Sequence, residues 1–326
     1  MKLVMMGTGT FAEPTFEALL AARETVVGLV TQPDRDGGHK RGSTRQTGKG
    51  MATIAAEAGI PVIQPPSINT PDGLAQLKAF NADLLVVAAY GQILKPDVIS
   101  SATHGAINVH ASLLPKYRGA SPIAHAILNG ETQSGVTIIR ITPGLDAGEM
   151  LAQEVVDILP NETTGELEAR LAPLGARMCL EVIQRMKAGP VSGEKQDPAL
   201  VTKAPKLTKE MGLIDWSQPA ERIASHVRAM QPWPTAYTFF HRPGKEPMRV
   251  AVSGVSSRPA SDREAASELG ELVVHMERGR MVIRAGGVSV VEVHELQPAG
   301  KKRMTAEEFL RGYPIQDGYR FGPEKV

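Results

Sequence analysis

The sequence predicts an α/β domain built on a mostly parallel sheet, followed by a smaller β-barrel domain. Short apolar runs alternate with helical stretches through residue 189, the order that a parallel sheet covered by helices requires. The run 84–88 (LLVVA) is apolar at every position, which is typical of a strand buried on both faces. Beyond residue 209, short alternating runs are separated by glycine and proline, as in a small barrel.

Each element of the first domain follows from its local pattern. Strands are predicted where apolar and β-branched residues cluster, at 2–6, 25–31, 84–88, 106–110 and 136–141. Helices are predicted near 12–22, 48–58, 72–79, 121–129 and 163–188. The longest of them is indicated by apolar side chains that recur every three or four positions from Leu167 to Met186.

The sequence Gly189-Pro190 ends the long helix, and the stretch 190–208 has no apolar periodicity. We therefore expect a catalytic domain at 1–189, a linker at 190–208 and a second domain at 209–326. The second domain is predicted to hold a helix at 219–230 and strands near 235–241, 247–255, 270–275, 280–285 and 288–296.

Composition indicates an ordinary globular protein. Of 326 residues, 42% are hydrophobic and 22% charged, and no apolar run approaches the ~20 residues that a membrane helix needs. A strand-like run begins after one lysine, which leaves no room for a signal peptide, so a cytoplasmic location is expected. The single Cys179 excludes an internal disulfide, and the histidines are not spaced as zinc ligands are, so no metal is predicted.

The most informative motif joins Asn108 and His110 to Asp146, which lies in the run 144–148 (GLDAG). Residues two apart on a strand leave the same face, where a later carboxylate can meet them. Transfer of an acyl group to an amine creates an oxyanion, to which an amide can donate, and releases a proton, which an imidazole can accept. A carboxylate can orient the imidazole, so these residues suit acyl transfer.

The run 7–12 (GTGTFA) fits the loose fingerprint of dinucleotide-binding proteins, so a nicotinamide-dependent enzyme is a competing interpretation. That fold places an acidic residue at the end of the second strand to hold the ribose. Here the predicted strand 25–31 is followed by Gln32. A tight turn between strand and helix explains the glycines better.

Taken together, the motifs resemble the methionyl-tRNA formyltransferases, enzymes that use 10-formyltetrahydrofolate. The resemblance spans nearly the whole chain, through LVMMGT at 3–8, QPDR at 32–35, AAYG at 88–91, SLLPKYRG at 112–119, DWS at 215–217, PWP at 232–234 and LQPAGKK at 296–302. It implies a Rossmann-like formyltransferase domain, an OB-like barrel that binds tRNA, and the catalytic trio Asn108, His110 and Asp146. The implied folate contacts are Ser112, Leu113, Leu114, Pro115, Tyr90 and Gly91.

The resemblance also implies the substrates: 10-formyltetrahydrofolate donates the formyl group, and initiator methionyl-tRNA accepts it for translation initiation. No membrane and no obligate protein partner are implied. The basic segment 33–50 is predicted to be a long loop that reaches the acceptor end of the tRNA. The predicted tRNA contacts are Arg35, His39, Lys40, Arg41 and Arg45 in this loop, with Lys301 and Lys302 in the barrel.

His39 departs from the family pattern, because an arginine is usual there, so Lys40 or Arg41 is expected to supply the phosphate contact. Arg278, Arg280 and Arg284 mark a hairpin that, with Arg303, gives the barrel a basic face. Two alternatives stay open: the same trio suits a formyltransferase acting on a small amine, such as an amino sugar nucleotide, and the two domains also suit a non-enzymatic RNA- or nucleotide-binding module.

Overall fold

The computed structural model describes residues 1–33, 48–275, 280–316 and 318–325. The chain divides into two compact units. The first unit comprises Met1–Ala126, Thr132–Pro160 and Gly165–Lys206, and the second comprises Ile127–Glu131, Asn161–Thr164 and Leu207–Val326. No helix among the described residues is long and apolar enough to cross a membrane.

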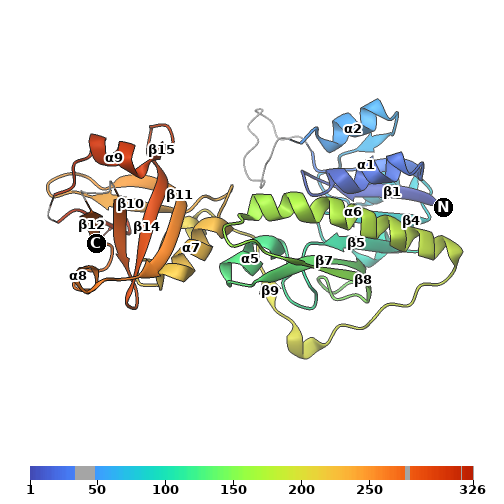
Figure 1. Ribbon diagram of the computed structural model, residues 1–326. Coiled ribbons are helices and arrows are strands. Elements are labelled where there is room, and N and C mark those ends of the chain that lie inside the picture. The colour runs from blue at the N-terminus through green and yellow to red at the C-terminus, as the bar shows by residue number, and fades with distance from the viewer. Residues whose placement is uncertain (34–47, 276–279, 317, 326) are drawn as a thin grey trace. The chain divides into compact units, whose positions relative to one another are not determined.

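A mostly parallel sheet forms the centre of the first unit (Figure 1). Its strands lie in the order β3 (Val62–Ile63), β2 (Thr25–Val30), β1 (Lys2–Gly7), β4 (Leu84–Ala88), β5 (Ala106–His110), β7 (Gln133–Arg140) and β8 (Met150–Asp157). Pairing is parallel from β3 to β5 and antiparallel from β5 to β8. Every residue of β4 is buried, as the apolar run predicted.

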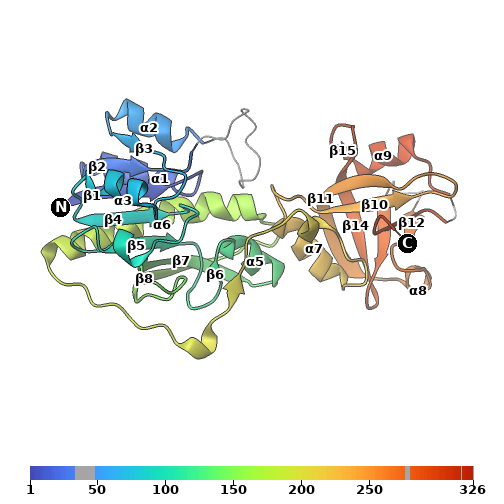
Figure 2. The ribbon, with the colours of Figure 1, turned by 180° about the vertical axis from the view of Figure 1, so that it is seen from behind.

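Helices cover both faces of this sheet. They are α1 (Glu13–Ala21), α2 (Met51–Glu57), α3 (Pro71–Lys78), α4 (Pro96–Ile99), α5 (Pro122–Leu128) and α6 (Thr164–Ala188). Figures 1 and 2 show α1 and α6 on one face and α3 on the other. Helix α6 packs closely on β5, because a Cβ added to Gly175 would lie 2.6 Å from Cγ1 of Val109.

The alternation of side chains along β5 places the polar residues of the motif. Val109 faces α6, so Asn108 and His110 leave the opposite face of the strand. On that face, Ala106 and Val87, which is paired with Asn108, belong to a buried apolar cluster that includes α3 and α4 side chains. The two polar side chains therefore lie on one face of β5, next to this apolar cluster. Their position on a common face is what their two-residue spacing predicted.

The chain after α6 runs back along the first unit as far as Lys206 (Figures 1 and 2). It forms an antiparallel bridge between Glu194 and Met150, a 3-10 turn at Pro198–Leu200, and the short strand β9 (Lys203–Ala204). Strand β9 pairs in parallel with β6 (Arg118–Gly119). The part of the predicted linker up to residue 206 thus lies against the unit that carries Asn108 and His110.

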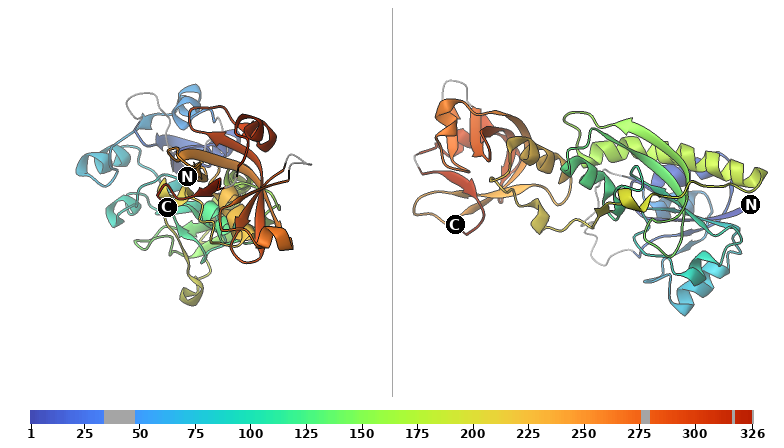
Figure 3. Two further views of the ribbon diagram at one scale, coloured as in Figure 1. Left: turned by 90° about the vertical axis from the view of Figure 1, so that its left-hand side faces the viewer. Right: turned by 90° about the horizontal axis from the view of Figure 1, so that it is seen from below.

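The second unit is a strongly curved antiparallel sheet, seen from two further directions in Figure 3. Its strands lie in the order β12 (Leu272–His275), β13 (Arg280–Ala285), β14 (Ser289–Pro298), β11 (Met248–Pro259), β10 (Tyr237–His241) and β16 (Arg320–Gly322), and β15 (Met304–Thr305) pairs with β14. A bridge between Glu271 and Arg320 joins the two ends of this order, which closes the sheet as in a barrel.

Helix α7 (Ala220–Ala229) packs on β11, and α8 (Asp262–Ala265) and α9 (Ala306–Gly312) complete the unit together with a 3-10 turn at Glu210–Gly212. Phe240 stacks edge-on against Phe309, Tyr319 and Phe321 in the interior. The predicted strands of this domain are all present. The sequence did not predict β15, β16, α8 or α9, which are short elements without a clear periodic pattern.

The sequence also missed β8. This strand lies at the edge of the sheet, and its residues alternate between half-buried and exposed after Leu151. Polar residues such as Gln153 and Glu154 interrupt its apolar pattern, so the strand is held mainly by backbone pairing with β7.

Candidate active site at the end of β5

The structure brings the three predicted catalytic residues together, although Asp146 is far from the others in sequence. Asp146 lies in the loop that joins β7 to β8, with a φ of 45°. Its Oδ1 accepts a hydrogen bond of 3.5 Å from Nδ2 of Asn108, and its Oδ2 lies 3.7 Å from Nδ1 of His110. Oδ2 also accepts a 2.9 Å hydrogen bond from the backbone N–H of Gly119. One carboxylate therefore contacts both partners.

His110 is fixed from its other side. Its Nε2 lies 3.0 Å from the carbonyl oxygen of Tyr117, and the imidazole is only 5% exposed. A carbonyl can only accept, so Nε2 carries a hydrogen and donates it. Nδ1, on the side of Asp146, is therefore the nitrogen at which the ring gains or loses a proton. Tyr117 is itself held by a hydrogen bond from its N–H to Thr202 Oγ1.

The predicted folate segment Ser112, Leu113, Leu114 and Pro115 directly follows β5. The hydroxyl of Ser112 is buried and donates to the carbonyl of Lys116, so it is used within the segment itself. Thr137 binds the Ser112 carbonyl and the Leu114 N–H, and Gln153 donates to the Leu114 carbonyl. The segment is thus rigid, and the half-buried Leu113 and Pro115 are its side chains partly open to solvent.

Tyr90 and Gly91, also predicted folate contacts, follow β4. The Tyr90 side chain points into the apolar core and is 2% exposed, and its hydroxyl has no hydrogen-bond partner among the described residues. This burial raises the pKa of the Tyr90 phenol to about 12. The neighbouring Ala89 and Gly91 are exposed at positive φ, and a Cβ on Gly91 would meet nothing within 4 Å. A ligand at this turn would therefore meet backbone groups.

The predicted tRNA contacts Arg35, His39, Lys40, Arg41 and Arg45 lie outside the described residues. The described residues on either side of this segment are held by hydrogen bonds. The side chain of Gln32 donates to the Tyr90 carbonyl, and the Glu13 carboxylate accepts hydrogen bonds of 3.0 Å from the N–H groups of Lys49 and Gly50. Gln32 thus lies beside the turn that follows β4, and Lys49 and Gly50 lie beside the first turn of α1.

The basic residues of the barrel separate into two kinds. Lys301 and Lys302 are exposed in the turn between β14 and β15. Arg284 is buried, and its guanidinium donates to the carbonyls of Ala285, Gly287 and Ser289. The sequence-based placement of Arg284 on a basic face of the barrel is therefore wrong, because this side chain holds the turn between β13 and β14.

Two residues near Asp146 were not assigned a role by the sequence. The side chain of Gln196 contacts both Arg118 and the loop of Asp146. Arg118 belongs to the run 112–119, which could have indicated it. Gln196 lies in the stretch 190–208, where no motif or periodicity marks it.

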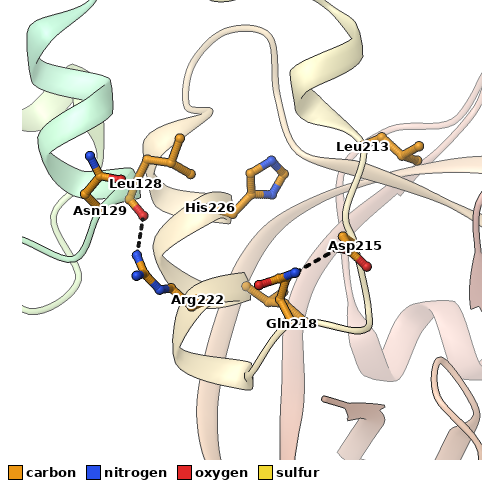
Figure 4. A pocket seen from close by; sticks show the side chains of 8 residues that line it. Leu128, Asn129, Leu213, Asp215, Gln218, Arg222 and His226 are labelled. Atoms are coloured by element: carbon orange, nitrogen blue, oxygen red, sulfur yellow. Dashed lines mark hydrogen bonds between the residues drawn. The ribbon is translucent and has the colours of Figure 1, made fainter. Parts of the chain in front are cut away.

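A cavity of about 300 Å³ lies in the second unit (Figure 4). Its lining residues are Leu128, Asn129, Leu213, Asp215, Gln218, Arg222, Ile223 and His226. The Asp215 carboxylate is already bound by Ser217 and by Gln218, and these hydrogen bonds hold its pKa below the usual range. The DWS motif therefore closes the turn before α7, with Trp216 buried and bonded to Thr238.

Among the described residues, no group of three or more histidine, cysteine, aspartate or glutamate side chains is placed to hold a metal ion.

Comparison with known proteins shows the family to which the chain belongs. Residues 1–183 match the formyl transferase family, and residues 206–314 match the formyl transferase C-terminal domain. Methionyl-tRNA formyltransferases from Geobacter metallireducens and Desulfotalea psychrophila are 39% and 42% identical to this chain. These alignments cover 99% and 97% of this chain and 99% and 94% of the relatives. The chain belongs to the methionyl-tRNA formyltransferase family.

Solved structures of formyltransferases share the fold. A methionyl-tRNA formyltransferase from Clostridium thermocellum superposes with a TM-score of 0.55 at 16% identity, over 78% of this chain and 93% of its own. An N-formyltransferase from Helicobacter canadensis, in complex with folinic acid and dTDP-3-aminofucose, gives a TM-score of 0.65 at 18% identity, over 90% and 98%. The predicted fold class is therefore confirmed. As a member of this family the chain is an enzyme, so the nicotinamide-dependent and non-enzymatic interpretations are not supported.

Proposed function

We propose that Asn108, His110 and Asp146 carry out formyl transfer from 10-formyltetrahydrofolate to the amino group of methionyl-tRNA in this enzyme. The observation that carries the proposal is the single Asp146 carboxylate that contacts Asn108 at 3.5 Å and His110 at 3.7 Å. No serine or cysteine nucleophile is needed, since an amine attacks a formyl carbon directly.

Each side chain takes a role that its contacts allow. Asn108 Nδ2 donates a hydrogen bond to the formyl oxygen, where negative charge develops as the amine attacks. His110 Nδ1 accepts the proton that the amine loses, because Nε2 is committed to the Tyr117 carbonyl, and returns it to the folate nitrogen as the bond between that nitrogen and the formyl carbon breaks. Asp146 stabilises the resulting imidazolium and keeps the Asn108 amide turned in the correct direction.

The turn after β4 and the segment after β5 fit a folate. When bound, 10-formyltetrahydrofolate supplies a formyl group already attached to a leaving nitrogen. The exposed backbone at Ala89 and Gly91 offers hydrogen-bonding groups to a flat heterocycle, with open space where a Gly91 side chain would stand. Leu113 and Pro115 offer apolar contact beside the trio. Ser112 and Tyr90 contribute through their backbone, since both side chains are buried.

We assign catalysis to the predicted domain 1–189 together with the segment up to Lys206 that packs on it, and tRNA binding to 209–326 with help from the basic segment 33–50. Positive charge for the RNA backbone comes from two pairs of residues. They are the exposed Lys301 and Lys302 of the barrel, and Lys40 and Arg41 of the basic segment 33–50. We also propose a cytoplasmic location, because the acceptor is used in translation. A small amine acceptor is less well supported, because the relatives near 40% identity are methionyl-tRNA formyltransferases.

A direct assay tests the acceptor. The protein is mixed with 10-formyltetrahydrofolate and either charged initiator tRNA or an amino sugar nucleotide, and formylated product is measured by mass spectrometry. We expect formylmethionine after hydrolysis of the tRNA. Product with the amino sugar nucleotide alone would contradict the proposal.

The basic loop is tested separately. Replacing Lys40 and Arg41 by alanine should weaken tRNA binding and reduce the slope of log affinity against log salt by about 1 to 2. The Lys49→Ala variant is a control for loss of a nearby exposed lysine, which is paired with Glu57 in the structure. An unchanged salt slope in the double variant would count against a role of the loop in tRNA binding.

A further inference from the structure

The loop that carries Asp146 has little structure of its own. Residues 142–145 are exposed, and within the tip the Ala147 N–H reaches the Gly144 carbonyl at 3.3 Å. Asp146 itself adopts a φ of 45°, a left-handed backbone region that aspartate tolerates better than most residues with a side chain. Contacts from outside the loop must therefore fix the direction of the Asp146 carboxylate.

The side chain of Gln196 supplies such contacts to the backbone. Its Nε2 donates to the carbonyl of Asp146 at 2.7 Å and to the carbonyl of Gly148 at 2.8 Å. The two hydrogens of the amide thus bind the carbonyls of the residues before and after Ala147. A shift of the loop away from β5 would break both hydrogen bonds together.

Arg118 fixes the other end of the same amide. Its Nε and Nη2 donate to Gln196 Oε1 at 3.0 Å and 2.7 Å. A guanidinium has no acceptor, so Oε1 must face Arg118 and Nε2 must face the loop. The amide therefore has one orientation, and that orientation supplies the two donors that the loop carbonyls require.

Both residues of this pair are anchored in the first unit. Arg118 is in β6, which pairs with β9, and the adjacent Gly119 N–H binds the Asp146 carboxylate directly. Gln196 lies two residues after Glu194, which exchanges backbone hydrogen bonds with Met150 at the start of β8. The pair thus joins the segment after β5 to the segment after α6, with the Asp146 loop held between them.

We infer that Gln196, oriented by Arg118, is a positioning residue that holds Asp146 against Asn108 and His110. Gln196 does not contact either of these side chains in the structure and acts only through the loop. The inference rests on the proposed catalytic role of Asp146. Gln196 should thus affect turnover rather than the binding of either substrate.

The test compares Gln196→Met, which keeps the length of the side chain but cannot form these hydrogen bonds, with Gln184→Met. Gln184 is exposed on α6 and bonds Glu24, so it controls for the same chemical change at a surface. Formyl transfer to charged initiator tRNA is measured with thermal unfolding of each variant. Gln196→Met should lower kcat by about 100-fold, the cost of a displacement near 1 Å, while the KM values and the unfolding temperature stay close to those of the wild type.

The double variant with Asp146→Asn distinguishes a positioning role from a general structural one. If Gln196 acts through Asp146, Gln196→Met causes no further loss of kcat in the Asp146→Asn background. Gln196→Glu, which keeps an acceptor for Arg118 but points an oxygen at the two loop carbonyls, should be as slow as Gln196→Met.

Three outcomes would overturn the inference. The first is a Gln196→Met variant as active as Gln184→Met. The second is a Gln196→Met substitution that lowers kcat by the same factor in the wild type and in the Asp146→Asn background. The third is wild-type kcat in Asp146→Asn, which would overturn the proposed role of the trio as well.

Discussion

Replacing Asp146 by asparagine removes one charge from the trio with little change of shape. Asparagine is among the residues that best tolerate the φ of 45° found here, whereas alanine would add backbone strain. At 3.7 Å, a carboxylate and an imidazolium attract each other by about 4 kcal/mol at an effective dielectric constant near 20. If His110 is fully protonated in the transition state, kcat should fall by about 10³-fold.

The assay is steady-state formyl transfer to charged initiator tRNA, followed across a range of pH. Binding of 5-formyltetrahydrofolate, measured by fluorescence titration, should be unchanged, because Asp146 acts on charge and does not hold the folate. Asp157→Asn is the control: this exposed aspartate at the end of β8 accepts a hydrogen bond from Gln133. A kcat equal to that of the control, or a parallel loss of folate binding, would refute the reasoning.

Three further predictions concern the rest of the fold. Arg284→Ala should lower the free energy of unfolding by about 2 to 3 kcal/mol in denaturant titration, because its guanidinium binds buried turn carbonyls; a loss no larger than for Lys302→Ala would contradict this. Burial lowers the pKa of His226, so stability should be complete above its ordinary pKa of ~6.5 and decline as the pH falls through it. His226→Gln should flatten that decline, and an unchanged decline would argue against it. Burial raises the pKa of the Cys179 thiol to about 12, so iodoacetamide should modify it, by mass spectrometry, only after unfolding; earlier labelling would disprove this.

Local patterns were sufficient for most of the fold. The strands β1, β2, β4, β5 and β7 were predicted because apolar and β-branched residues cluster in them, and helix α6 was predicted because its apolar side chains recur every three or four positions. Helix α6 buries Leu167, Leu171, Met178 and Val182, as the three- and four-residue spacing required. Strand β8 was missed because an edge strand with polar residues depends on its neighbour for its conformation.

The family motifs also indicated the trio, because Asn108 and His110 lie two apart on one strand and Asp146 follows another. They did not indicate which way each side chain points. The side chain of Tyr90, which the resemblance implies as a folate contact, is turned into the core, and Arg284, which was placed on a basic face, binds its own turn. Side-chain direction depends on what packs around a residue, and a sequence pattern does not record it.

The sequence by itself determined the succession of strands and helices, the family and the chemical groups available for formyl transfer, since each is encoded in short runs of neighbouring residues. Only the tertiary structure decided how those groups are held. The hydrogen bond between Gln196 and Asp146 joins residues 50 apart, and its donor lies in a stretch without any periodic signal. Such a contact exists only after β6, β9 and the loop before β8 have packed together, because no one of these segments can fix the carboxylate alone.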